Sequence, residues 1–292
     1  MELNEQDGRA TTQAVANTGY DSRSAGSAQH ELVPLQAVIF DVDGTLADTE
    51  ANGHRVAFNR AFDEFGLDWH WSEKLYGELL AVTGGKERIR HYAKTHAPDL
   101  LGRVDIDTWV ARLHKLKSEI YSNLILAGGI PLRPGVARLI HELRDAGVRL
   151  AIATTTTPSS LASLIMAHFG QDMLELFEVV GAGDIVPHKK PAPDIYHWVL
   201  RNLELPPEAC LVVEDSLPGL AAARAAGIPT LVTVSAYTVA ERFDGAVSVV
   251  SDLGEMSAPA THLAGLPLAG ACVDLAQIRT WHAAAQGGQR PA

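Results

Sequence analysis

The chain has little cysteine and no long hydrophobic run. Its two cysteines, Cys210 and Cys272, lie far apart in 292 residues, and Cys210 stands in the apolar stretch ACLVV. We therefore expect a buried thiol and no disulfide, which indicates a reducing compartment and a cytoplasmic protein. No run approaches the roughly 18 apolar residues that a membrane-spanning helix needs, so we expect no membrane partner.

Basic residues are also scarce, because 24 of them face 35 acidic residues and leave a formal net charge of -11. This charge repels a polyanion, and no cluster of about five or more basic residues offsets it, so nucleic acid is not expected as a partner. Hydrophobic residues make up 47% of the chain, which is enough for a packed core. The protein is predicted to be globular, and its oligomeric state, for which a monomer is compatible, stays open.

Residues 1–33 lack the features of a targeting segment. They contain no apolar stretch like that of a secretory signal, and the early acidic residues Glu2, Glu5 and Asp7 are not typical of a transit peptide. We predict a disordered polar N-terminal tail over residues 1–33.

Beyond the tail, short β-branched runs alternate with helical segments. The runs are AVIFDV, VRLAIAT, EVVGA, CLVVED and PTLVTV. Runs that are bounded by Gly, Pro and Asp and separated by helices indicate a parallel sheet with both faces covered. The predicted fold class is therefore α/β, with a doubly wound, Rossmann-like parallel core.

A long insertion separates the first two predicted strands. Its sequence indicates helices throughout, and we predict a small α-helical cap domain over residues 50–131. The core domain would comprise residues 34–49 and 132–253, so two connections join it to the cap and make a hinge. Residues 254–292 are expected to be a C-terminal extension with one short helix at VDLAQIRTWH.

Polar residues gather where the predicted strands end. Ligands of an open α/β sheet bind outside the carboxyl ends of its strands, so these residues are expected to share one site. Carboxylates and water form the oxygen shell that Mg²⁺ prefers, while a hydroxyl and an ammonium group complement a phosphoryl group beside that metal. The candidates, in chain order, are Asp41, Asp43, Thr154, Lys190, Glu214 and Asp215.

Each candidate also has an ordinary structural explanation. An aspartate after a strand, such as Asp215 or Asp48, is often a turn former or a helix cap. The run TTTT could supply a strand end and a cap before Pro158, and a lysine before proline is usually solvated. These explanations do not account for all the candidates standing in order at the ends of successive strands, so we favour a catalytic site.

Four segments, DVDGT, LAIAT, KKPAPDIY and VVEDSLPGL, resemble the motifs of the haloacid dehalogenase superfamily. The insertion is similar to the helical cap of its phosphoglucomutase-like branch. The segments TGGKERI, GGIPLRPG and IATTTTP resemble the CbbY group of that branch, and the similarity extends from about residue 36 to VDLAQIRTWH. The resemblance implies an enzyme that removes one phosphate from xylulose 1,5-bisphosphate, an inhibitor of rubisco.

The resemblance also assigns roles in the core. Asp41 is expected to be the nucleophile that forms an aspartyl-phosphate. Asp43 is expected to act as general acid and then as general base, and the two-residue spacing directs both carboxylates toward one region. Thr154 would bind a phosphoryl oxygen, and Lys190 would neutralise charge on Asp41. The resemblance implies a Mg²⁺ ion that contacts Asp41, the backbone carbonyl of Asp43, Asp215 and, directly or through water, Glu214.

Substrate choice is expected to come from the cap. The CbbY pattern implies that Lys86 and Arg88 hold the distal phosphate of a sugar bisphosphate, while Gly84 and Gly85 free backbone N–H groups at a helix start. The alternative is that the basic residues of this segment belong to one solvated helix face. Further substrate contacts are expected from Glu50, His54 and Tyr76.

Three other functions stay open. A β-phosphoglucomutase-like phosphosugar mutase would share the fold, the aspartyl-phosphate and the cap, but TGGKERI favours the phosphatase. A phosphatase of another small phosphoester is the second, because a cap loop can redirect specificity. The third is a noncatalytic binding protein on this fold, which would not need the whole set of core residues.

Overall fold

The structure is a computed structural model that describes residues 32–102, 104–170 and 173–287. The described residues belong to one compact unit. The tail predicted over residues 1–33 lies almost wholly outside the described residues.

A seven-stranded sheet forms the centre of the described core, in the order β3-β2-β1-β4-β5-β6-β7. Strands β1 to β6 pair in parallel, and β7 pairs with β6 in the antiparallel direction. The predicted doubly wound α/β fold is confirmed. The strands are β1 (Ala37–Phe40), β2 (Arg149–Ala153), β3 (Val179–Gly181), β4 (Cys210–Glu214), β5 (Thr230–Thr233), β6 (Ser248–Val250) and β7 (His262–Gly265).

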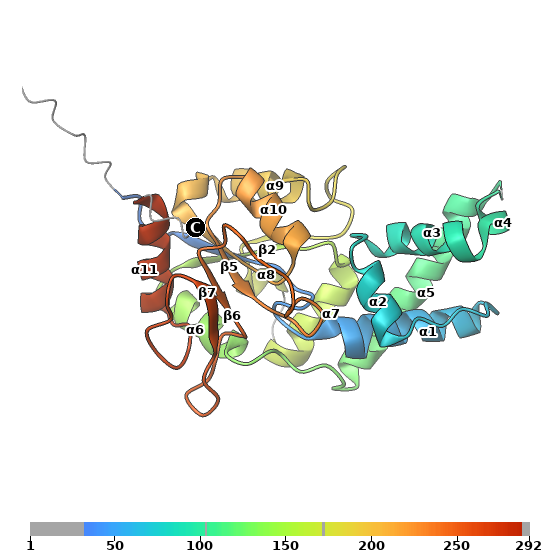
Figure 1. The fold of residues 1–292 in the computed structure, drawn as a ribbon, viewed down its shortest axis with the longest axis horizontal. Helices are drawn as coiled ribbons and strands as arrows, with labels where there is room; N and C mark the ends of the chain where they lie inside the picture. The colour runs from blue at the N-terminus through green and yellow to red at the C-terminus, as the bar shows by residue number, and fades with distance from the viewer. Residues whose placement is uncertain (1–31, 103, 171–172, 288–292) are drawn as a thin grey trace, which may run out of the picture. The chain divides into compact units, whose positions relative to one another are not determined.

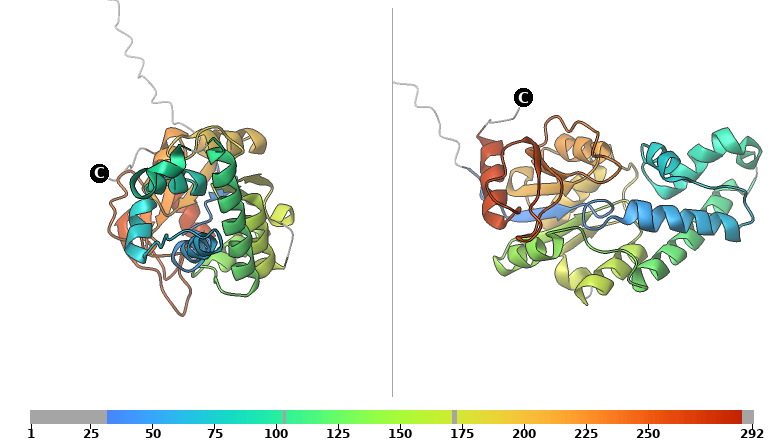
Figure 2. Two further views of the ribbon diagram at one scale, coloured as in Figure 1. Left: turned by 90° about the vertical axis from the view of Figure 1, so that its right-hand side faces the viewer. Right: turned by 60° about the horizontal axis from the view of Figure 1, so that its bottom comes forward.

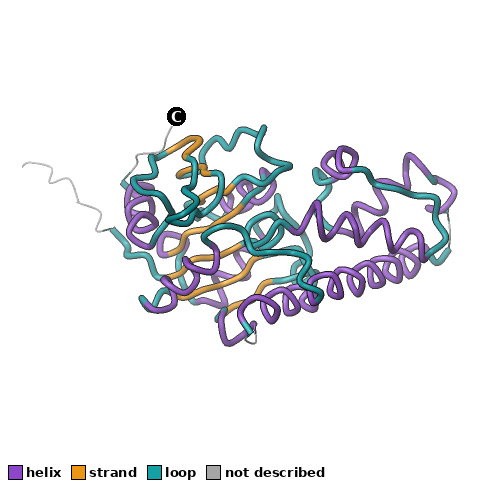
Figure 3. Tube along the Cα trace, turned by 90° about the horizontal axis from the view of Figure 1, so that it is seen from below, coloured by secondary structure: helices purple, strands orange, loops and turns teal. Residues whose placement is uncertain are grey.

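Helices cover both faces of this sheet, as Figures 1 and 3 show. In β1, Val38 and Phe40 belong to one buried cluster and Ala37 and Ile39 to another, because successive side chains of a strand point to opposite faces. Helices α6, α7 and α11 pack in the first cluster, and α9 and α10 pack in the second. The helices around the sheet are α6 (Val136–Asp145), α7 (Pro158–Phe169), α8 (Met173–Leu176), α9 (Asp194–Leu203), the short 3-10 helix Pro207–Ala209, α10 (Leu217–Ala225) and α11 (Leu275–Gln286).

The cysteines agree with their prediction. Cys210 lies fully buried in β4, and both Cys210 and Cys272 are free thiols. Burial raises the pKa of the Cys210 thiol to about 12, which keeps it protonated and unreactive.

The last two strands were not predicted from the sequence. Strand β7 has four exposed residues, HLAG, so it carries neither an apolar run nor the alternation of a half-buried strand. Its place in the sheet comes from pairing with β6. Residues 254–292, expected as an extension with a short helix, thus supply an edge strand and helix α11, which packs on the core through Trp281.

The described part of the insertion after β1 consists of helices joined by turns and loops. It has its own hydrophobic cluster, in which the rings of Phe58, Phe62, Trp69 and Trp71 pack against one another. Figure 2 shows α1 and α5 side by side. The helices are the π-helical turn Glu50–His54, α1 (Arg55–Glu64), α2 (Glu73–Leu79), α3 (Gly85–His96), α4 (Pro98–Leu101) and α5 (Ile106–Leu126). In the described residues, no helix combines the length and the apolarity needed to cross a membrane.

The packing of α11 on the core leads to a prediction about the free energy of unfolding. Trp281 is 1% exposed, and its indole N–H donates to the carbonyl of Pro267 at 3.1 Å. We expect Trp281→Ala to lower the free energy of unfolding by about 3–5 kcal/mol in urea denaturation, because it removes a buried aromatic ring. Met256→Ala is the control, since Met256 is 78% exposed in the same segment. Equal stability of the two variants would show that the C-terminal segment is a dispensable extension.

Candidate active site

The first part of the site is the turn that follows β1. The N–H of Asp41 donates to the carbonyl of Val213 at 3.0 Å, so Asp41 still belongs to the pairing of β1 with β4. The chain then turns at Gly44, whose φ is +82°, and Gly44 donates to the carbonyl of Ala47 at 2.9 Å. A Cβ at Gly44 would lie 2.1 Å from Oδ2 of Asp215, so only glycine allows the turn to pass this close.

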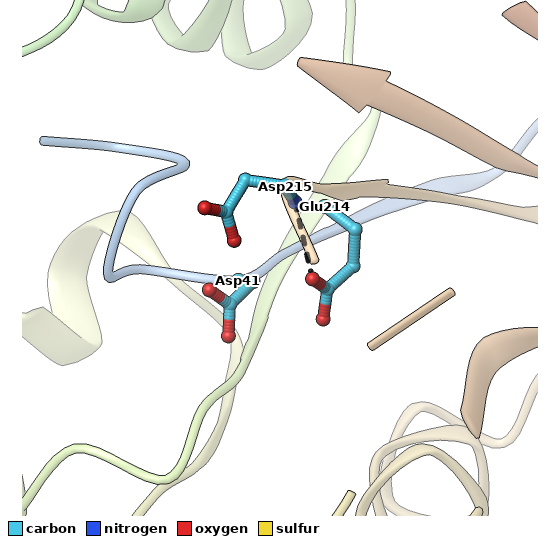
Figure 4. Close-up of side chains that lie close together, drawn as sticks. All are labelled: Asp41, Glu214 and Asp215. Atoms are coloured by element: carbon cyan, nitrogen blue, oxygen red, sulfur yellow. Dashed lines mark hydrogen bonds between the residues drawn. The ribbon is translucent and has the colours of Figure 1, made fainter. Parts of the chain in front are cut away.

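Three buried carboxylates meet at the ends of β1 and β4, as Figure 4 shows. The pairing of Phe40 with Val213 places Asp41 next to Glu214, and Asp215 follows. One oxygen from each of the three carboxylates lies within 4.8 Å of the others. The predicted metal ligands Asp41, Glu214 and Asp215 are therefore brought together.

Lys190 lies against these carboxylates. Its ammonium group donates to Oδ1 of Asp41 at 2.7 Å, to Oε1 of Glu214 at 2.5 Å and to the carbonyl of Ala153 at 2.8 Å. The side chain is 5% exposed. Burial lowers the pKa of Lys190, but Asp41 and Glu214 raise it by more, so the amine stays charged.

Glu214 is held on both oxygens by the protein itself. Besides Lys190, Tyr196 donates to Oε1 at 2.8 Å, and the hydroxyl of Ser216 donates to Oε2 at 3.1 Å. Gly219 leaves room for this carboxylate, because a Cβ there would lie 1.9 Å from Cδ of Glu214. Asp41 and Asp215 are thus the two carboxylates better placed for direct contact with a cation, and Glu214 supports them.

The charges of the cluster fit a divalent cation. Burial raises the pKa of Asp41 to about 8 in spite of the opposing charge of Lys190. Burial, with the charges of Glu214 and Asp41, raises the pKa of Asp215 well above its usual range. One ammonium group does not balance three buried carboxylates, and carboxylate oxygens are the ligands of hard divalent cations.

Asp43 is held in a separate network. Thr49 donates to its Oδ1 at 2.6 Å, His54 Nε2 lies 2.7 Å from the same oxygen, and Thr156 donates to Oδ2. Burial acts to raise the pKa of Asp43, but His54 and the three hydrogen bonds outweigh it, so the pKa is lowered. Asp43 is therefore poised as a carboxylate beside Asp41.

His54 contacts Asp43 and is itself held by two further residues. It is 6% exposed, its ring stacks on Tyr121 at a centroid distance of 3.9 Å, and its Nδ1 lies 2.5 Å from Nζ of Lys117. Lys117 is itself buried on α5, and burial lowers its pKa to about 8. The structure thus places His54, expected to contact substrate, between Asp43 and Lys117.

The helical insertion after β1, called the cap from here on, contributes a second group of polar residues. Arg88 is 7% exposed and donates to the hydroxyl of Tyr76 at 2.9 Å and to the carbonyl of Leu79 at 3.1 Å. Tyr76 is fully buried and donates in turn to Glu50. Arg88 therefore does not lie on a solvated helix face. Tyr76 links Arg88 to Glu50 because its hydroxyl group forms a hydrogen bond with each of them.

Lys86 lies elsewhere. Its ammonium group pairs with Asp184 of the core, and Lys189 bridges Asp184 at 3.0 Å to Glu87 of the cap at 3.3 Å. The hydrogen bond from Lys86 is the main cause that lowers the pKa of Asp184 to about 2. These four residues form a crossed set of ion pairs between cap and core.

A cavity of about 320 Å³ joins the two groups. Thr154 reaches it at the end of β2, fully buried, with its hydroxyl oxygen 3.2 Å from the N–H of Thr156. Lys86, Tyr76, His54 and Glu214 are not among the described residues that line it. The predicted residues that line it are Asp41, Asp43, Glu50, Gly84, Arg88, Thr154, Lys190 and Asp215.

Comparison with known proteins agrees with this geometry. The sequence model of the haloacid dehalogenase-like hydrolases matches residues 35–227. The chain belongs to this family. It is 48% identical over 249 residues to the plasmid-encoded protein CbbY of Cupriavidus necator, over 85% of this chain and 97% of the relative. The predicted resemblance to the CbbY group is confirmed.

Two solved structures of CbbY from Rhodobacter sphaeroides are also similar to this hydrolase. One is a complex with phosphate, with a TM-score of 0.70 and 44% identity over 76% of this chain and 98% of that chain. The other is a mutant in complex with xylulose-(1,5)bisphosphate, with a TM-score of 0.69 and 43% identity over the same shares of the two chains.

Several residues of this hydrolase's site were not predicted. Thr49, Thr156 and Lys117 build the surroundings of Asp43, and Tyr237 brings the loop after β5 to the cavity and to Tyr76. Only Thr156 had a signal, because it lies two residues after Thr154 in the run TTTT.

The close approach of Gly44 to Asp215 gives a prediction with a matched control. We expect Gly44→Ala to lower kcat by about 100-fold, because the added Cβ displaces the carboxylate of Asp215. Gly147→Ala imposes the same left-handed strain, since Gly147 has φ +73° but nothing within 4 Å of its Cβ. We expect this control to keep kcat within about twofold of the parent in a steady-state phosphate assay. Equal losses in both variants would mean that backbone strain alone is responsible.

Proposed function

We propose that this hydrolase is a Mg²⁺-dependent phosphatase that converts xylulose 1,5-bisphosphate to xylulose 5-phosphate through an aspartyl-phosphate on Asp41. The observation that carries the proposal is one cavity that holds Asp41, Asp43 and Lys190 from the core together with the buried Arg88 from the cap. The relative bound to xylulose-(1,5)bisphosphate supports the choice of substrate.

In the first step, a carboxylate oxygen of Asp41 attacks phosphorus, and the bond from phosphorus to the sugar oxygen breaks. Asp43, a carboxylate in the free protein, would take up a proton as the substrate binds and give it to the departing sugar oxygen. In the second step, Asp43 takes a proton from water, the water oxygen attacks phosphorus, and the bond to Asp41 breaks. Thr49, His54 and Thr156 hold Asp43 in place for both transfers.

Lys190 and Thr154 would assist transfer of the phosphoryl group. The ammonium group of Lys190 orients Asp41, to which it donates at 2.7 Å, and its charge favours the ionised carboxylate against the effect of burial. Thr154, at the end of β2, is placed to donate to a phosphoryl oxygen.

The cation would be held by Asp41 and Asp215, with the backbone carbonyl of Asp43 as a further expected ligand and Glu214 acting directly or through water. When bound, Mg²⁺ supplies positive charge to the phosphoryl oxygens and to the carboxylates. The excess of buried carboxylates over ammonium groups at this point supports that assignment.

The cap would select the substrate. Arg88 faces the cavity with a planar fork of donors that suits a phosphate, and Gly84 exposes backbone at the start of α3 beside it. Glu50 is placed to accept from sugar hydroxyls. Tyr76 would act on the substrate through Arg88 and Glu50, and His54 would act through Asp43. Lys86 and Gly85 do not line the main cavity. The cytoplasmic location and the absence of a nucleic-acid partner stay predictions, and the oligomeric state stays open.

A substrate panel tests the proposal. We expect release of inorganic phosphate from xylulose 1,5-bisphosphate at a kcat/KM at least about tenfold above that for sugar monophosphates, because Arg88 adds a charge-assisted contact to the second phosphate. EDTA should abolish release, and added Mg²⁺ should restore it. Equal rates on monophosphates would overturn the bisphosphate assignment. Movement of phosphate to another hydroxyl without release would identify a mutase.

The positions of Arg88 and Lys86 predict unequal roles. We expect Arg88→Ala to raise KM for the bisphosphate by the equivalent of about 1.5–3 kcal/mol, while KM for a monophosphate changes little. Lys86→Ala, the matched variant on the same helix, should have a smaller effect, because Lys86 is paired with Asp184 outside the main cavity. A larger effect from Lys86→Ala than from Arg88→Ala would show that Lys86 leaves this pair to bind the substrate.

A further inference from the structure

Arg133 lies in the second connection between cap and core. Its N–H donates to the carbonyl of Leu46 at 2.9 Å, and its neighbour Leu132 forms an antiparallel bridge with Ala47. The two connections therefore run side by side at this point. The side chain of Arg133 turns inward and is 6% exposed.

The guanidinium group of Arg133 contacts four backbone carbonyls. Nη1 donates to the carbonyl of Gly44 and to the carbonyl of Thr233 at 3.0 Å, and it also reaches the hydroxyl of Thr233 at 3.1 Å. Nη2 donates to the carbonyl of Val234 at 2.5 Å and to that of Ser251 at 2.7 Å. One side chain thus ties the turn after β1 to the ends of β5 and β6.

The charge of Arg133 is balanced mainly by these carbonyls. The carboxylate found beside it belongs to Asp48, at 3.5 Å from Nε, and that side chain is 56% exposed. A guanidinium group can serve several acceptors at once because its five N–H donors lie in one rigid plane. A lysine carries three donors at a single point and cannot span the same acceptors, so the arrangement requires arginine.

The carbonyl of Gly44 is the contact that matters for chemistry. Gly44 follows Asp43 directly, and the Cα of Gly44 lies against Asp215, as the predicted overlap of a Cβ shows. Arg133 and Asp215 thus both lie against this turn. Arg133 is not among the described residues that line the cavity, so it acts through the turn.

We propose that Arg133 is a positioning residue for phosphoryl transfer, which keeps the turn of Asp41, Asp43 and Gly44 in register with the ends of β5 and β6. This inference rests on the proposed function, because it concerns the aspartates that the proposed reaction uses.

Arg138 provides a matched control. It lies on α6 and also donates from Nη2 to three carbonyls, those of Leu253 and Gly254 at 3.0 Å and that of Val273 at 3.1 Å. In the part of the chain that the structure describes, its hydrogen bonds go to this C-terminal segment and to Glu142, away from the turn after β1. Both arginines thus tie loops to the core, but one of them holds the catalytic turn.

The experiment compares Arg133→Lys and Arg138→Lys in the full chain with xylulose 1,5-bisphosphate and Mg²⁺. We expect Arg133→Lys to lower kcat by about tenfold or more with KM within about twofold, because a small displacement of reacting groups slows chemistry without removing a substrate contact. Arg138→Lys should keep kcat within about twofold of the parent. Tm is measured for each variant, so that loss of folded protein is separated from loss of positioning.

Equal kcat values for the two variants at matched Tm would overturn the inference. If Arg133→Lys does not fold, Thr233→Val decides, since it removes one acceptor of Nη1 and keeps the arginine. We expect Thr233→Val to lower kcat about two- to fivefold, and an unchanged kcat would overturn the inference. A parent protein that releases no phosphate would instead contradict the proposed function.

Discussion

The ammonium group of Lys190 is the contact on which the rest of the site depends. It joins Asp41 of β1, Glu214 of β4 and the last carbonyl of β2 in one buried position. Burial favours the neutral forms of Lys190 and Asp41, and the attraction between their opposite charges acts against it. Tyr196 and Ser216 donate further hydrogen bonds to the carboxylate of Glu214, while Asp41 and Asp215 face the cavity.

The second constraint is that the residues of the site come from two parts of the chain, the core and the cap, each with its own hydrophobic cluster. Asp41 and Asp43 follow a strand buried in the core clusters, while Arg88 and Tyr76 are held by the aromatic cluster of the cap. Contacts between the units are of two kinds. Polar contacts join His54 to Asp43, Lys86 to Asp184 and Lys189 to Glu87. Apolar contacts place Tyr121 and Ile125 of α5 in the buried cluster of the core.

The sequence predicted the site residues that directly follow a strand of the sheet. Asp41, Thr154 and Asp215 follow buried strands of one parallel sheet, so their meeting place was predictable because the carboxyl ends of parallel strands share one edge. Lys117 and Thr156 were not, because neither directly follows a predicted strand, and no sequence pattern marks their contacts with His54 and Asp43. Arg88 and Lys86 looked alike in sequence, yet residues two apart on a helix point in different directions. Strand β7 was missed because its exposed residues have no pattern and pairing alone determines it.

The central claim, that Asp41 carries the phosphate during turnover, is tested most directly by acid quenching the enzyme within milliseconds of mixing with substrate and Mg²⁺. Peptide mass spectrometry then locates any covalent phosphate. The account predicts phosphate on the peptide that contains Asp41, and none in Asp41→Asn, which should fold but not turn over. Covalent phosphate on another residue, or substantial turnover by Asp41→Asn, would contradict it.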